Sequence, residues 1–176
     1  MTTTAVRASA PRADFRRVVI GATVGAAILN LVINAGVALV QARGQHHIPL
    51  WGISVAHPSV ITDSLGVLIS LPLLTCVICT TALRRDGQLP QLDPAALGRL
   101  SALASIGVGR RAVRMAVITF VAIGPPIVLG LLFVTRSGMT HMDFVIYHVA
   151  LTVVLGVIVT PVVALLAMTD RRNEVP

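Results

Sequence analysis

Residues 144–168 read FVIYHVALTVVLGVIVTPVVALLAM and contain no Asp, Glu, Lys or Arg. A helix needs about 20 apolar residues to cross the hydrocarbon core of a bilayer, because each residue adds about 1.5 Å of length. Three more stretches of the sequence meet this requirement, at residues 18–40, 64–83 and 115–135. The sequence therefore predicts an all-α integral membrane protein, built as a bundle of four transmembrane helices.

The composition of the 176-residue chain excludes the usual soluble classes. Hydrophobic residues make up 55% and charged residues 12%, whereas about a quarter of the residues in a soluble domain are charged. A disordered chain needs the opposite balance, and the 14 Gly and 10 Pro residues follow no collagen-like period. We predict one transmembrane domain over residues 15–172, with cytoplasmic tails at 1–14 and 173–176, the first of them disordered.

The basic residues predict the orientation of the spans. All 14 are arginines, and 12 of them lie before the first span, between the second and third, or after the fourth. Only Arg43 and Arg136 lie in the other two loops. Because positively charged loops are retained on the cytoplasmic side, we predict a multi-pass protein of a cell inner (plasma) membrane with both termini in the cytoplasm. The lipid bilayer explains the basic charge, so no nucleic-acid partner is predicted.

The connection between the second and third spans predicts a short amphipathic helix on the inner membrane surface. Asp93 followed by Pro94 is typical of an N-cap and a first helical position, and apolar residues then recur at helical spacing. A solvated linker with one helical turn is the alternative. If the amphipathic helix forms, four arginines lie near anionic headgroups, each attracted by about 1 kcal/mol: Arg99, Arg110, Arg111 and Arg114.

Small residues and prolines predict how the helices pack. Gly21 and Gly25 have the G-x-x-x-G spacing that lets two helices approach closely, within the chain or in a homodimer. Pro125 and Pro126 fall in the middle of the third span and predict an interruption of its hydrogen bonds. The first external loop, residues 41–62, contains several glycines and prolines and is predicted to lack regular structure.

The two halves of the sequence are similar in outline. Each has an arginine pair, a span, an external loop, a span with one proline (Pro72 or Pro161) and a second arginine pair. Because both halves begin and end on the same side, this pattern would be a parallel repeat of two helical hairpins. Hairpins with basic cytoplasmic ends share these features without common ancestry, which is the alternative.

Polar residues in or beside the spans predict a ligand-binding site. Polar side chains inside a membrane face the bundle interior, and those of each span fall on one helical face. We expect them to line one cleft that opens outward and takes a small polar solute, a metal ion or a proton. The six candidate ligand-binding residues are Asn30, Asn34, Asp63, Ser70, His148 and Thr152.

The histidines all fall in the outer half of the predicted topology, together with two aspartates. Imidazole and carboxylate are ligands for zinc, copper or iron, and they also relay protons. The candidate metal ligands are His46, His47, His57, Asp63, His141, Asp143 and His148. Their spacing matches no metal-binding motif, so no cofactor is predicted and a metal ion is left open. The alternative is that the loop histidines are merely polar and that Asp63, and Thr140 or Asp143, are helix caps.

Enzyme motifs are not found in the sequence. Cys76 and Cys79 form a C-x-x-C in the inner half of the second span, where packing cysteines are favoured over a redox pair. No phosphate-binding glycine loop or nucleophile elbow occurs. We therefore predict a permease-like membrane protein rather than an enzyme. The alternative is a non-catalytic structural or accessory protein whose intramembrane polar residues only pack helices.

Overall fold

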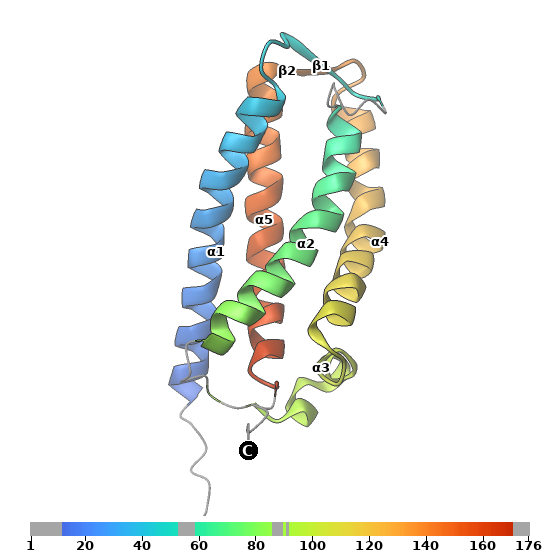
Figure 1. The fold of residues 1–176 in the computed structure, drawn as a ribbon. Helices are drawn as coiled ribbons and strands as arrows, with labels where there is room; N and C mark the ends of the chain where they lie inside the picture. Colours follow the sequence, from blue (N-terminus) through green and yellow to red (C-terminus); the bar gives the residue numbers. More distant parts are fainter. Residues whose placement is uncertain (1–11, 53–58, 86–89, 91, 171–176) are drawn as a thin grey trace, which may run out of the picture.

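The computed structural model describes residues 12–52, 59–85, 90 and 92–170 (Figure 1). Four of its helices are long and apolar enough to cross a membrane, which confirms the four predicted spans. They are α1 (Arg12–Gln41), α2 (Val60–Arg85), α4 (Val108–Val134) and α5 (His141–Ala167). α1 begins inside the predicted tail, and residues 1–11 and 173–176 of the two predicted tails lie outside the described part of the chain.

The four long helices do not pack in chain order. α1 packs on α5, α5 packs on α2, and α2 packs on α4. The most apolar stretch of α5 is 44% buried and that of α2 is 33% buried, against 17% for α4 and 0% for α1. α2 and α5 therefore form the centre of the bundle, and α1 and α4 lie at its two sides (Figure 1).

The central helices α2 and α5 run in the same direction, from the end with the strands toward the end with the C-terminus (Figure 1). The first helix of each hairpin packs on the second helix of the other hairpin, because α1 contacts α5 and α4 contacts α2. This exchange has the pattern of a two-fold axis parallel to the helices. It is the arrangement that a parallel repeat of two hairpins would produce.

Two short strands join the hairpins at one end of the bundle. β1 (His47–Pro49) and β2 (Gly138–Thr140) pair antiparallel, with Ile48 opposite Met139. The prediction that the first external loop lacks regular structure is therefore wrong at β1. A three-residue strand is too short to show a period in the sequence, and its partner lies in the other half of the chain.

Proline does not end the helices in which it occurs. Pro125 and Pro126 lie inside α4, which continues from Val108 to Val134, so the predicted interruption does not divide the third span. The glycine before them is buried where α4 faces α2: a Cβ at Gly124 would lie 3.7 Å from the side chain of Leu68, which is an ordinary van der Waals distance.

The segment before α4 differs from the single amphipathic α-helix that was predicted. It consists of a 3-10 helix, η1 (Pro94–Leu100), and one turn of α-helix, α3 (Ser101–Ala104). Inside η1, Gly98 takes a positive φ of 54°, which breaks the helical path. The side chain of Asp93 accepts a hydrogen bond from the backbone N–H of Ala95 at 2.9 Å, which confirms the predicted N-cap. Leu103 is buried against the ends of the long helices.

Candidate functional site

Asp63 lies in the first turn of α2, where its side chain faces α5. The helix begins earlier than the predicted span, because the hydroxyl of Ser59 accepts a hydrogen bond from the N–H of Thr62 at 3.4 Å. The N–H of Asp63 already donates to the Ser59 carbonyl at 2.9 Å. The interpretation of Asp63 as a helix cap is therefore wrong, and its carboxyl group is left for another partner.

That partner is His148, two turns into α5. Nδ1 of His148 lies 2.6 Å from Oδ2 of Asp63, and the two side chains are only 2% and 6% exposed. At this distance one proton is held between the ring nitrogen and the carboxyl oxygen. Burying either ionisable group without a partner at this depth would cost free energy. The hydrogen bond between the two groups offsets that cost.

A second hydrogen bond joins the same two helices beside this pair. The hydroxyl of Ser64 donates to the carbonyl of Val60 at 2.6 Å, and its oxygen lies 2.7 Å from the hydroxyl of Tyr147. Because a serine hydroxyl has one hydrogen, Tyr147 is the donor of the second bond. Two consecutive residues of α2 thus bind two consecutive residues of α5, one pair able to carry charge and one neutral.

The other ring nitrogen of His148, Nε2, is buried and has no hydrogen-bond partner among the residues that the structure describes. The ring centroids of Phe144 and His148 lie 5.9 Å apart. Buried polar atoms are nearly always paired with protein, water or ligand. Nε2 is therefore the atom of this pair whose hydrogen-bonding capacity is not used within the described residues.

The six candidate ligand-binding residues do not line one cleft. Only Asp63 and His148 meet, whereas Asn30, Asn34 and Ser70 line a groove between α1 and α2. Thr152 is buried, and its hydroxyl donates to the carbonyl of Val149 on its own helix at 3.0 Å. The six residues therefore do not share one cleft, since the amides of α1 do not reach the Asp63–His148 pair.

The candidate metal ligands also stay apart. Nε2 of His47 lies 3.0 Å from the carbonyl of Ser137, and Nδ1 of His141 lies 2.9 Å from the carbonyl of Ala42. Both rings are therefore hydrogen-bonded to the backbone. His46 is exposed and His57 is outside the described residues. In the described ranges, no three His, Cys, Asp or Glu side chains come together as a metal site. A metal centre thus receives no support from this geometry.

Asp143 belongs to the start of α5. Its backbone N–H donates to the hydroxyl of Thr140 at 3.3 Å, and that hydroxyl donates to the Asp143 carboxylate at 2.6 Å. Thr140 is therefore the N-cap of α5, which confirms one of the two predicted caps. The carboxylate of Asp143 is used in the same capping arrangement.

Sequence reasoning missed a second charged cluster, at the opposite end of the bundle. Arg111 was expected among lipid headgroups, but it is fully buried. Its Nη1 and Nη2 bind the two carboxylate oxygens of Asp170 at 3.1 and 2.7 Å, and Nη2 of Arg84 also lies 2.8 Å from Asp170. The start of α4 and the ends of α2 and α5 are joined by this cluster.

The guanidinium of Arg111 also holds the end of α3. Its Nε donates to the carbonyl of Leu103 at 3.0 Å, and Nη2 donates to the carbonyls of Ala104 and Ile106 at 3.3 Å each. The only sequence signal was a single aspartate directly after the fourth span, next to an arginine pair. The positive-inside rule accounts for all the arginines at this end together. Nothing in the sequence therefore distinguishes Arg111 from the others.

Comparisons with known proteins add no relative, because no protein-family model, no curated protein and no solved structure matches the chain. The class of the protein therefore comes from its fold alone. It is a helical bundle with four helices able to span a membrane. Its two clusters of hydrogen-bonded charged groups lie at opposite ends of the central helix pair.

Proposed function

We propose that the protein is a small permease-like protein of a cell inner membrane, and that the species it handles is a proton at the Asp63–His148 pair. The observation that carries this proposal is a buried imidazole with one nitrogen bound to a carboxyl group and the other, Nε2, unpartnered. An imidazole in this arrangement can gain a proton at Nε2 while Nδ1 shares its proton with Asp63. Intramembrane ionisable pairs commonly mark proton relays.

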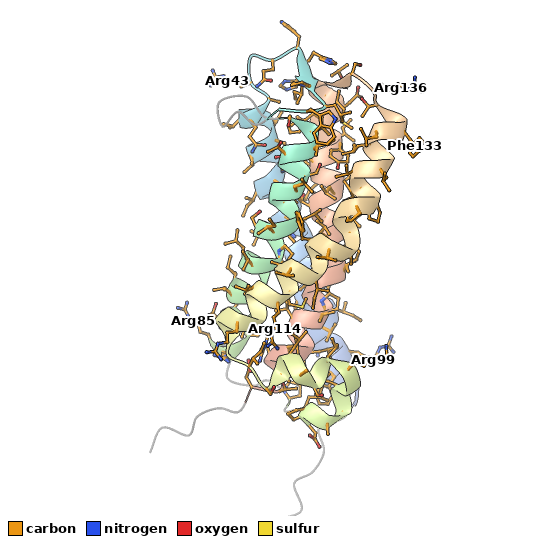
Figure 2. The ribbon with its side chains drawn as sticks, turned by 90° about the vertical axis from the view of Figure 1, so that its right-hand side faces the viewer. Arg43, Arg85, Arg99, Arg114, Phe133 and Arg136 are labelled. Carbon is orange, nitrogen blue, oxygen red and sulfur yellow. The ribbon has the colours of Figure 1, made fainter. Side chains whose placement is uncertain are left out.

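The distribution of arginine supports an orientation with both termini in the cytoplasm. Arg85, Arg99 and Arg114 lie at the end of the bundle opposite to Arg43 and Arg136 (Figure 2). Under the positive-inside rule the arginine-rich end is cytoplasmic. The Asp63–His148 pair then lies near the outer surface and would exchange protons with that side.

A structural or accessory role is the second candidate, and a specific observation favours it. Several polar side chains bind the carbonyls of their own helix, as Thr23 does with Val19 at 2.7 Å and Asn34 with Asn30 at 2.9 Å. Residues satisfied in this way need no ligand. On this hypothesis the Asp63–His148 pair would serve only to hold α2 against α5.

The two candidates differ in what happens when the ionisable groups are replaced. We expect Asp63→Asn and His148→Gln to abolish proton uptake by proteoliposomes that contain a pH-sensitive dye, because both changes keep a hydrogen bond and remove a titrating group. The matched control is Tyr147→Phe, which breaks the neutral bond to Ser64 between the same helices. Equal proton uptake in all these variants would contradict proton handling and leave the structural role.

A further inference from the structure

A narrow groove runs between α1 and α2 on the side of the bundle that α5 does not cover. Its volume is about 340 Å³, and it extends on α1 from Ala22 to Asn34 and on α2 from Val67 to Leu83. By the helical rise this is about 18 Å along α1. Small residues open it on the α1 side, where Gly25 and Ala26 face the bulkier α2.

The groove is apolar and open to the surrounding membrane. Leu29 on one rim is 51% exposed and Leu74 on the other is 59% exposed, while Val67 and Leu71 at its floor are buried. In a bilayer such a surface is covered by hydrocarbon or by another helix. The side chains that line the groove are mostly apolar, which suits an acyl chain.

Arginine residues lie beyond one end of the groove on both helices. Ile78 and Ala82 line it near its end, and Arg85 follows them at helical spacing on α2. On α1, Arg16 and Arg17 lie about one and a half turns before the first groove residue. All three arginines are exposed, and within the described residues none of them has a carboxylate partner, in contrast to Arg84.

We propose that this groove binds one anionic phospholipid of the leaflet at the arginine-rich end. One acyl chain lies between α1 and α2, and the phosphate group is bound by Arg85, Arg16 and Arg17. The acyl chain covers the apolar lining of the groove, and the negative headgroup is attracted by these arginines. Arg85 lies at the arginine-rich end in Figure 2, on a different element from Arg99 and Arg114. The site is independent of the Asp63–His148 pair.

The test is native mass spectrometry of the full chain in detergent with phosphatidylglycerol or phosphatidylcholine added. We expect one phosphatidylglycerol to stay bound and to be preferred over phosphatidylcholine. The triple variant Arg16→Gln, Arg17→Gln, Arg85→Gln should lose this preference. We expect each substitution to lower the affinity for phosphatidylglycerol relative to phosphatidylcholine about fivefold. Ala26→Phe should fill the groove and abolish retention of both lipids. Thermal unfolding of each variant checks that the bundle is intact.

Matched controls make the same kinds of substitution away from the groove. The double variant Arg99→Gln, Arg114→Gln takes two exposed arginines from the same end, and Val121→Phe adds a ring on the exposed face of α4. Both controls should keep one preferred phosphatidylglycerol. The proposal is overturned if the triple variant still prefers phosphatidylglycerol, or if Ala26→Phe keeps the lipid. It is also overturned if the bound species is a second copy of the chain that Ala26→Phe dissociates, because Gly21 and Gly25 would then form a dimer contact.

Discussion

Among single residues, Arg111 has the most complete set of partners in the described structure. Its guanidinium binds Asp170 with two nitrogens and caps the end of α3 through three carbonyls. A bidentate carboxylate bond of this kind is directional and strong when it is buried. The side chain therefore closes the arginine-rich end of the bundle from the inside, whereas its neighbour Arg110 is exposed.

We predict that Arg111→Ala lowers the free energy of unfolding by roughly 3–5 kcal/mol, because it leaves buried carbonyls and part of the Asp170 carboxylate unpaired. Denaturant titration of the purified protein in detergent measures this change. Arg110→Ala is the control and should change stability by less than about 0.5 kcal/mol. Similar effects of the two substitutions would show that the buried cluster does not stabilise the fold.

How far the sequence predicts the site also depends on single residues. His148 could be singled out because an ionisable residue inside an apolar span is unusual, and Asp63 because it directly precedes the second span in the same outer half. Arg111 could not, because its burial depends on where α4 begins, and that helix starts seven residues before the predicted span. The residue is placed by the packing of α3 and α5, which has no local pattern.

At the scale of elements, long helices are predictable and short ones are not. Each of the four spans follows from 20 or more consecutive residues that are mostly apolar and carry no Asp, Glu, Lys or Arg. β1, β2, η1 and α3 have seven residues or fewer. Their form is decided by distant contacts, such as the pairing of Ile48 with Met139. This is why the first loop was predicted to be irregular.

The β1–β2 pair depends on Gly138. Its φ is 122°, and a Cβ there would collide with the carbonyl oxygen of Ile48. We predict that Gly138→Ala separates the strands and costs about 1–3 kcal/mol of stability. The fluorescence of Trp51, two residues after β1, should change with it. Gly130→Ala in α4 meets no neighbouring atom and is the control; an unchanged Trp51 signal in the Gly138 variant would contradict this account.

At the scale of the whole molecule, the two hairpins exchange partners around the α2–α5 pair. Neither hairpin buries its apolar surface against itself, because α1 packs on α5 and α4 packs on α2. The strand pair joins them at one end, and the Arg84–Asp170–Arg111 cluster joins them at the other. The two hairpins are therefore held together at both ends of the bundle as well as along the α2–α5 pair.

The proposed orientation can be tested on the whole protein by cysteine labelling. In a variant with Cys76 and Cys79 replaced by Ala, we expect a membrane-impermeant thiol reagent to label His46→Cys on intact cells and to leave Ser105→Cys unlabelled until the membrane is opened. Both positions are exposed in the structure and lie at opposite ends of the bundle. The reverse pattern would place the termini outside.

The shared direction of α2 and α5 has an electrostatic consequence. Every helix carries about half a positive charge at its start and half a negative charge at its end. Two parallel helices side by side therefore place like poles together, and in a medium of low dielectric constant these poles repel. Asp63 lies where both helices begin. Arg84, Arg111 and Asp170 lie where both end, and two arginines with one aspartate leave one net positive charge there. The Asp63 carboxylate and this net positive charge have the signs that compensate the macrodipoles of the central pair, and so they favour its parallel arrangement.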